Sequence, residues 1–169
     1  MNRKEYSLLI EGWRKFLFEE VESLPRVKAE DVEVVFPDSI DRDLLEKGDQ
    51  DGEISGFAIK RDKEDREIEQ DRAGIYHNKK LVGFMTPREE KGGWRVGAIY
   101  VDEDVRKNFK GIGGIAISKF FEGREAADLL IGVSNEASQR AFSKAGFENT
   151  GKAYKDDSDG WEATWWSRR

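Results

Sequence analysis

The sequence predicts a mixed α/β domain in which helices flank a central mixed, mostly antiparallel sheet. Two observations lead to this prediction. Segments with apolar residues at three- and four-residue steps are interspersed with short strand-like runs. The length of 169 residues suits a single domain, and ten Phe, five Trp and four Tyr provide the large side chains of a hydrophobic core.

Composition narrows the classes of function. The chain has 35 Asp and Glu against 29 Lys and Arg, a net charge of −6, which argues against a general nucleic-acid or anionic-membrane binder. It has no Cys and one His, His77, so disulfides, thiol nucleophiles and Cys/His metal centres are excluded and no metal is expected. No stretch resembles a secretory leader or a spanning helix, so the expected location is cytoplasmic.

The first half of the chain is expected to form the following elements. Residues 1–24 are interpreted as an appended amphipathic helix, since Leu9, Trp13 and Phe16 recur at helical spacing over 4–23. A strand over 31–36, an acidic helix or turn over 38–47 and a loop over 48–52 come next. Charged, alternating segments predict strands over 54–60 and 67–76, and a hairpin turn over 77–80.

The second half has clearer patterns. We expect strands over 81–85 and 94–101 separated by a turn over 89–93, then a Gly-rich loop and a helix over 110–121. A buried strand over 128–133 precedes a helix over 136–144 that Gly146 ends. Strands over 147–155 and 161–166 form a hairpin around an acidic turn at 156–160.

The loop over 101–114 has the features of a phosphate site. Gly111, Gly113 and Gly114 allow successive backbone N–H groups to point toward one spot, and the helix that follows adds partial positive charge there. Lys107 and Lys110 add cationic contacts. The spacing is neither that of a Walker loop nor that of a dinucleotide fingerprint.

A second segment makes the first more specific. Asn135, Ser138 and Phe142 share one face of the predicted helix, and Gly146 and Phe147 turn into the next strand. Together with the Asn-Phe-Lys-Gly-Ile-Gly run at 108–113, these anchors resemble the two motifs of the GCN5-related N-acetyltransferase (GNAT) superfamily. The resemblance covers about residues 73–169, and Asn108 stands where the family pattern has Gln or Arg.

The resemblance implies acetyl-CoA as co-substrate. The N–H groups of residues 110–114 would hold the pyrophosphate, the backbone of 99–101 would pair with the pantetheine arm, and Asn135 would approach that arm. The residues implied in cofactor binding are Ile99, Tyr100, Val101, Asn108, Phe109, Lys110, Gly111, Ile112, Gly113, Gly114, Asn135, Ser138 and Phe142.

Three departures from the family pattern concern catalysis. The run from Val101 to Gly111 is about two residues longer than in the family, so the loop is expected to bulge. Phe142 stands where many members carry a Tyr that protonates the leaving thiolate, and a phenyl ring donates no proton. Leu130 and Arg95 stand where relatives keep a carboxylate base.

Other side chains are substitute candidates for acid, base or relay, each with an ordinary structural role as the alternative. They are His77, Tyr100, Ser138 and Tyr154. The acidic turn at 156–159 would attract a cationic amine at the acceptor entrance, and its alternative is a solvated hairpin tip.

Two functions follow. The first is acetyl-CoA-dependent transfer of an acetyl group to a primary amine of a small molecule or a protein. The second is a GNAT-like domain that binds CoA without efficient turnover, or a structural or interaction module of viral origin with the N-terminal helix as a tag. The sequence leaves the acceptor and the oligomeric state open, a homodimer included.

Overall fold

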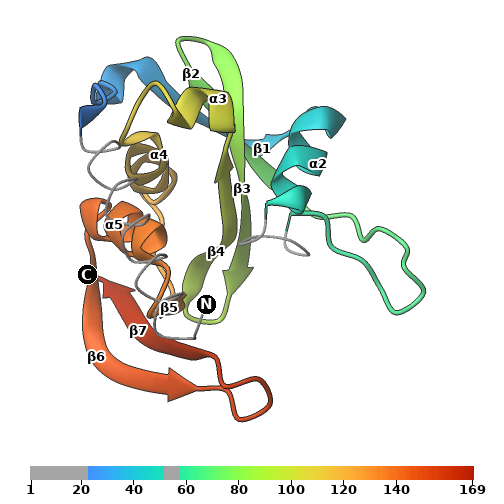
Figure 1. Cartoon of the computed structure of the whole chain (residues 1–169), viewed down its shortest axis with the longest axis vertical. Coiled ribbons are helices and arrows are strands. Elements are labelled where there is room, and N and C mark those ends of the chain that lie inside the picture. The colour runs from blue at the N-terminus through green and yellow to red at the C-terminus, as the bar shows by residue number, and fades with distance from the viewer. Residues whose placement is uncertain (1–22, 52–57) are drawn as a thin grey trace, which may run out of the picture.

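A computed structural model describes residues 23–51 and 58–169 of the chain (Figure 1). The helix expected over 4–23, apart from its last residue, and residues 54–57 of an expected strand lie outside the described residues. The described elements, in chain order, are η1 (Ala29–Asp31), β1 (Val32–Asp38), α2 (Arg42–Gln50), β2 (Arg72–His77), β3 (Lys80–Glu90), β4 (Gly93–Val101), α3 (Glu103–Arg106), α4 (Ile112–Phe120), β5 (Leu129–Gly132), α5 (Glu136–Lys144), β6 (Phe147–Lys155) and β7 (Glu162–Arg168).

The strands form two antiparallel sheets in place of the single mixed sheet that we expected. The first has the order β1-β2-β3-β4 and the second the order β5-β7-β6. One parallel bridge, Trp94 to Ala126, joins β4 to the segment before β5. There the Trp94 N–H donates to the Glu125 carbonyl and the Ala127 N–H donates to the Trp94 carbonyl, both at 2.8 Å. Beyond this bridge the two strands separate.

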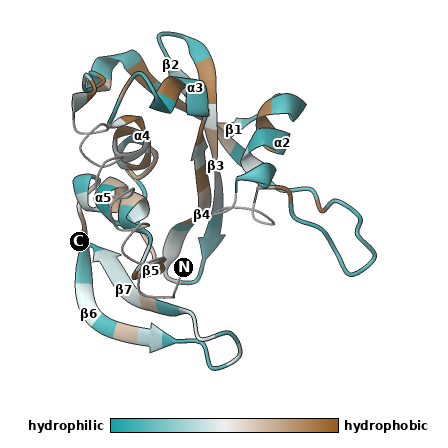
Figure 2. Cartoon of the chain, viewed as in Figure 1, coloured by the Kyte–Doolittle hydropathy of each residue, from teal (hydrophilic) through white to brown (hydrophobic). Residues whose placement is uncertain are grey.

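Helices cover both faces of the four-stranded sheet. Figure 1 shows α4 and α5 on one side of β3 and β4 and α2 on the other, and Figure 2 shows apolar residues along these strands and along α4. The larger core cluster joins α4 to the sheet through side chains such as Phe120, Met85 and Ile75. A smaller cluster packs Leu44 and Leu45 of α2 on Phe84 and Tyr100 of the sheet.

The first half of the chain differs from expectation in the length of α2 and in the segment 58–71. The helix α2 continues to Gln50 through Gly48, which had been expected to begin a loop. Residues 58–60 and 67–71 do not form the expected strands. An isolated bridge between Arg61 and Glu67 is the strand-like pairing in this segment. The Asp62 carboxylate accepts the N–H groups of Glu64 and Arg66 at 2.8 and 3.0 Å and closes a turn that alternation could not reveal.

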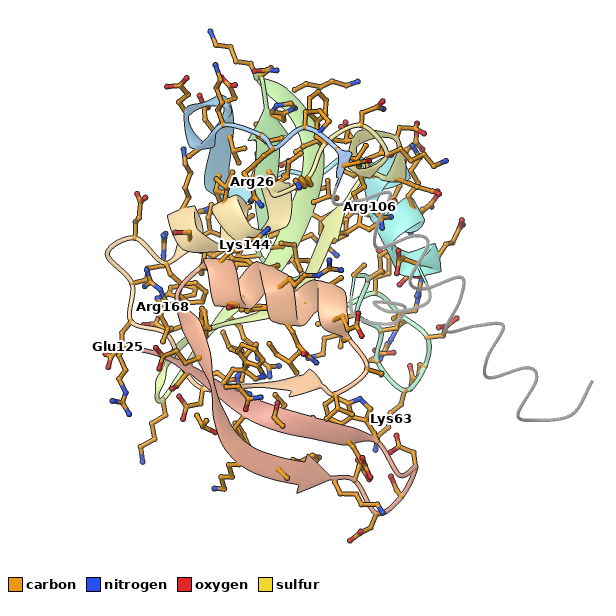
Figure 3. All side chains as sticks on the ribbon, turned by 60° about the vertical axis from the view of Figure 1, so that its left-hand side comes forward. Arg26, Lys63, Arg106, Glu125, Lys144 and Arg168 are labelled. Atoms are coloured by element: carbon orange, nitrogen blue, oxygen red, sulfur yellow. The ribbon has the colours of Figure 1, made fainter. Side chains whose placement is uncertain are left out.

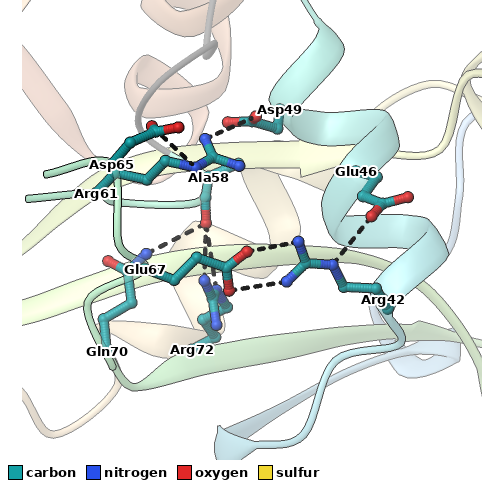
Figure 4. Close-up of polar contacts among 9 residues, drawn as sticks. All are labelled: Arg42, Glu46, Asp49, Ala58, Arg61, Asp65, Glu67, Gln70 and Arg72. Atoms are coloured by element: carbon teal, nitrogen blue, oxygen red, sulfur yellow. Dashed lines mark hydrogen bonds and ion pairs between the residues drawn. The ribbon is translucent and has the colours of Figure 1, made fainter.

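Ion pairs hold the segment 58–72 beside α2 (Figure 4). The Arg42 guanidinium donates to Glu67 at 2.8 Å and to Glu46 at 3.0 Å. The hydrogen bond from Arg42 lowers the pKa of the Glu67 carboxyl below its usual value. Arg72 donates to the Ala58 carbonyl at 3.0 Å, and burial lowers the pKa of Arg72.

The second half follows the sequence closely. The helix α5 and the strand β6 have the expected bounds, and β4 begins one residue earlier than expected. Asn78 and Lys79 have positive φ angles of 49° and 66°, as a two-residue hairpin turn requires. The strand β3 is longer than expected, reaching Glu90, and the one-turn helix α3 was not expected.

Candidate active site

A cavity of about 610 Å³ lies where β4 and β5 separate. Its volume is in the usual range for small-molecule sites. The residues that line it come from β4, β5, the loop before α4, the helices α4 and α5 and four further positions in or beside other elements: Asp51, Val96, Gly97, Ala98, Ile99, Tyr100, Val101, Arg106, Phe109, Lys110, Gly111, Ile112, Gly113, Gly114, Leu129, Leu130, Ile131, Gly132, Asn135, Ala137, Ser138, Arg140, Ala141, Phe142, Lys144 and Trp161.

Two strand edges face this cavity. β4 is the last strand of its sheet and β5 is the first of the other, so each has one edge that pairs with no neighbouring strand of its sheet. The pairing of β3 with β4 shifts between Met85 and Pro87, which places Gly97 and Ala98 in a bulge. Backbone amides and carbonyls along such edges can pair with an extended ligand that carries amides of its own.

The first turn of α4 forms part of the cavity wall. Gly111 is the N-cap with φ of 94°, a left-handed conformation that glycine adopts without strain. Helix geometry leaves the N–H groups of Ile112, Gly113 and Gly114 without an acceptor inside the helix. A Cβ on Gly114 would lie 3.2 Å from the Lys144 Cβ, so this glycine lets α4 and α5 pack closely.

The backbone N–H of Lys110, which we expected to bind a pyrophosphate, already has a hydrogen-bond partner within the chain. The Lys110 N–H donates to the Pro25 carbonyl at 3.0 Å, and the Lys110 carbonyl accepts from Val27 at 3.0 Å. The expectation that N–H groups from Lys110 onward hold a pyrophosphate is therefore wrong for Lys110, whose backbone fastens the loop to the segment before η1. Lys110 still lines the cavity.

Helix α5 adds polar and aromatic groups to the opposite wall. The Asn135 side chain caps the helix by accepting the Ser138 N–H at 3.1 Å. Phe142 is 5% exposed and packs edge-to-face on Phe147, with 5.2 Å between ring centroids. Asn135, Ser138 and Phe142 all line the cavity, as their shared helical face predicts.

Of the residues implied in cofactor binding, only Asn108 does not line the cavity. Its side-chain amide donates to the Asp104 carbonyl at 2.7 Å. The extra length between Val101 and Gly111 forms the helical turn α3, which the Asp102 carboxylate caps by accepting the Asp104 N–H at 3.1 Å. The expected bulge is thus an ordered turn, and it directs Asn108 back onto α3.

Two of the four candidate acid and base residues lie in the cavity and two lie outside it. Tyr100 and Ser138 line the cavity, whereas His77 and Tyr154 do not. The His77 ring packs on Phe109, with 5.0 Å between centroids, and the Tyr154 ring lies 6.1 Å from that of Trp161 at the cavity rim.

The positions that hold a base in the family pattern have other roles here. Leu130 contributes apolar surface to the cavity. Arg95 donates to the Asp128 carbonyl at 2.7 Å and pairs with Glu90 at 3.2 Å, which ties the beginning of β4 to the segment before β5.

The acidic hairpin turn uses two of its carboxylates internally. The Asp156 carboxylate accepts the Ser158 hydroxyl at 2.6 Å and the Ser158 N–H at 2.8 Å, and these bonds lower the pKa of Asp156. The Asp159 carboxylate accepts the Trp161 N–H at 2.8 Å. These contacts shape the turn that presents Trp161 to the cavity.

Of the charged residues on the cavity wall, Lys110 alone had been expected from the sequence. Arg106, Lys110, Arg140 and Lys144 line the cavity, and within the described part of the chain Asp51 is the one carboxylate that does. Figure 3 shows Lys144 on α5 and Arg106 beside α2. Asp51 and Arg106 are 55 positions apart, so no local pattern signals that they meet.

Searches of the described ranges gave two negative results. Within residues 23–51 and 58–169, no three His, Asp or Glu side chains gather as a metal ion would need. In the same ranges, no helix has the length and apolar character to cross a membrane.

Solved structures share this architecture. No family model and no curated protein matches the sequence. A GNAT-family acetyltransferase from Bacillus cereus superposes with a TM-score of 0.53 at 17% identity, over 82% of this chain and 97% of that one. A Bacillus subtilis acetyltransferase solved in complex with CoA superposes with a TM-score of 0.54 at 14% identity, over 82% and 99%. The chain therefore has the fold of the GNAT acetyltransferases, as its two motifs predict.

Proposed function

We propose that this chain binds acetyl-CoA between β4 and β5 and transfers the acetyl group to a primary amine. The observation that supports this most directly is the cavity flanked by two strand edges and by the N-terminus of α4. An amide-rich pantetheine arm matches the edges, and a pyrophosphate matches a helix N-terminus. The CoA complex of the Bacillus subtilis structure adds support by analogy of fold.

The space around Gly113, in the first turn of α4, bears on whether the cavity wall suits such a ligand. A Cβ on Gly113 would have only the side chains of Ile99 and Ala141 nearby, at 3.7 and 3.8 Å. Larger side chains at these glycines would fill the space beside the first-turn amides. Lys110, Arg140 and Lys144 would add charge-assisted contacts to phosphates.

The transfer itself forms a C–N bond and breaks the C–S bond of the thioester. The ammonium first loses a proton to water, because only the neutral amine has a lone pair that can attack, and the nitrogen loses a second proton to water as the CoA thiolate departs. Phe142 offers that thiolate no proton, so the sulfur would leave as the anion or take its proton from water or from another group such as Tyr100. Slow turnover relative to binding is the consequence.

The test is ligand binding by a matched pair of glycine variants. Thermal unfolding with CoA, acetyl-CoA and NAD at about 100 times the dissociation constant should show stabilisation by about 2.7 kcal/mol for both CoA forms only. For a chain of this size the shift is about 5–10 °C. Gly111→Glu should abolish it, because it adds a negative charge at the N-cap of α4, where a Cβ would also lie 3.2 Å from Arg26 Nη1.

Gly123→Glu is the control. Gly123 also has a positive φ, 72°, and a Cβ there would meet nothing within 4 Å, so Gly123→Glu adds the same charge at another left-handed glycine, outside the cavity. Binding lost in both variants would point to strain rather than to the site. Absence of a CoA shift in the unmodified chain would refute the proposal. Binding of CoA with no acetyl transfer to any amine would favour the alternative of a CoA-binding module.

A further inference from the structure

The second sheet presents an apolar face to the cavity. Neighbouring side chains of a strand point to opposite faces of its sheet. Leu129 and Ile131 of β5 belong to the core cluster that includes α4 and α5, so Leu130 points to the opposite face, and Leu130 lines the cavity. It pairs across the strands with Trp165 of β7, which therefore lies on the same face. This face thus carries an aliphatic and an aromatic side chain next to each other.

Trp161 lies on the same face, beside Leu130. Gly132 follows two residues after Leu130 and pairs with Ala163 of β7. A Cβ on Gly132 would lie 3.2 Å from the Trp161 Nε1 and 3.7 Å from its Cζ2, so the indole ring takes the space that a larger side chain would fill. Trp161 lines the cavity and is 43% exposed, and its ring lies 6.1 Å from that of Tyr154. The apolar face therefore continues from inside the cavity to its rim.

Leu130 is level with the bulge of β4. The two strands are parallel at the bridge between Trp94 and Ala126, and Ala98 and Leu130 are each four residues further along their strands. Ala98 lies in the bulge. With a pyrophosphate at the N-terminus of α4, the pantetheine arm runs back along β4 from Val101, and the thioester at its far end comes near this bulge. An amine that attacks from the face opposite α4 and α5 has Leu130 beside it.

The charged groups that line the cavity lie away from this place. Lys110, Arg140 and Lys144 belong to the loop before α4 and to α5, on the other face of the sheets. Arg106 donates to the carbonyl of the last β4 residue at 2.7 Å, and Asp51 lies 3.7 Å from Arg106, so both are at the far end of β4 from the bulge. A group that extends from the amine along β5 therefore meets the apolar face.

We propose that the acceptor is a primary amine whose remaining part is an aromatic or large aliphatic group, and that this group binds against Leu130 and Trp161. The proposal rests on the proposed function, because it assigns the acceptor of the same cavity. Binding removes from water part of an indole ring that is exposed in the free chain, and aromatic rings pack well on one another. A second charge at the far end of the amine would lose its water on this face without gaining a partner.

The experiment measures release of CoA thiol from acetyl-CoA with two matched pairs of amines. 2-Phenylethylamine and ethylamine differ by a phenyl ring, and pentylamine and 1,4-diaminobutane have the same length but differ by a terminal charge. The first member of each pair should have a kcat/KM about ten-fold or more above that of the second, because a matching apolar pocket discriminates by at least that ratio. In the presence of CoA, 2-phenylethylamine should also raise the Tm of the unmodified chain.

Two variants assign this preference to the apolar face. Trp161→Ala, at an exposed ring, and Leu130→Gln, of similar length but polar, should each remove most of the difference between 2-phenylethylamine and ethylamine. CoA affinity should stay within about two-fold in both, because the phosphate-binding groups lie on the other face. Val133→Ala is the control: Val133 follows β5 directly and is 52% exposed, but it does not line the cavity, so this variant should keep the full preference.

The outcomes separate the two proposals. A chain that binds acetyl-CoA but acetylates none of these amines, or shows no preference within the two pairs, overturns the apolar acceptor and leaves the cofactor site standing. A preference that survives in both variants overturns the assignment to Leu130 and Trp161. A fall in CoA affinity in Trp161→Ala as large as its fall in kcat/KM would assign the ring to the cofactor and overturn it too. A chain that binds no CoA refutes the proposed function, and this inference with it.

Discussion

At the scale of single residues, Arg95 fixes the point where β4 separates from the second sheet. Its guanidinium reaches the Asp128 carbonyl and Glu90 at once. Arg95→Met should weaken CoA binding about ten-fold, about 1.4 kcal/mol, because the spacing of the two strand edges is no longer held. Isothermal titration of CoA measures this.

Arg88→Met is the control for Arg95. Arg88 lies opposite Arg95 across the strand pair and binds the same Glu90 at 2.7 Å, an ion pair that stays within β3. CoA affinity should be unchanged in this variant. An equal loss in both variants would assign the effect to Glu90 and the end of the hairpin instead of to the link with β5.

Phe142 is the residue whose substitution tests proton donation. Phe142→Tyr should raise acetyl transfer, because a hydroxyl on a ring that lines the cavity can protonate the leaving thiolate. Stopped-flow or steady-state thiol release measures the rate, with thermal unfolding alongside. A flat rate with a lower Tm would mean that the hydroxyl is buried without a partner, at a cost of about 1–3 kcal/mol.

At the scale of elements, the contact of α2 with the sheet depends on one glycine. A Cβ on Gly48 would lie 2.6 Å from the Phe84 Cζ, and the Phe84 ring is fully buried beside Tyr100. Gly48→Ala adds helix propensity of about 1 kcal/mol. Overpacking costs about 1–3 kcal/mol, so we expect net destabilisation.

Chemical denaturation of Gly48→Ala measures this balance, and Gly92→Ala is the control. A Cβ on Gly92 would have only the Ala127 Cβ near it, at 3.8 Å, an ordinary van der Waals distance. The free energy of unfolding of Gly92→Ala should therefore stay close to that of the unmodified chain. A stabilised Gly48→Ala variant would show that α2 can move away from the sheet without loss.

At the scale of the whole molecule, stability should fall in acid. Hydrogen bonds lower the folded-state pKa of Glu67, Asp62 and Asp156 below their usual values. The unfolded chain then binds more protons than the folded chain as the pH falls through about 4. The stability from these groups is present above about pH 5 and is lost below.

Thermal unfolding between pH 7 and pH 3 measures this dependence. The Tm should be level from about pH 7 to 5 as far as these carboxyls are concerned, and should then fall. Glu67→Gln should lose less on acidification, because its contact with Arg42 no longer titrates. Because these groups are exposed, each contributes little. A Tm that rises below pH 4 would contradict the assignment.

Local sequence determined much of the α4–α5 half of the molecule. The glycines at 111, 113 and 114, the Asn135 cap and Gly146 act within a few residues, through allowed φ angles and caps, so their spacing was sufficient to predict α4, α5 and the cavity wall. The GNAT fold followed from the same motifs.

Only the tertiary structure decided how distant segments meet. The backbone of β4 joins the segment before β5 through the Trp94–Ala126 bridge, and the use of the Lys110 amide depends on Pro25. The approach of Asp51 to Arg106 depends on α2 packing over Tyr100. Such contacts arise from packing between residues far apart in the chain, where no local spacing records which partners meet, whereas caps and turns are written in neighbouring residues.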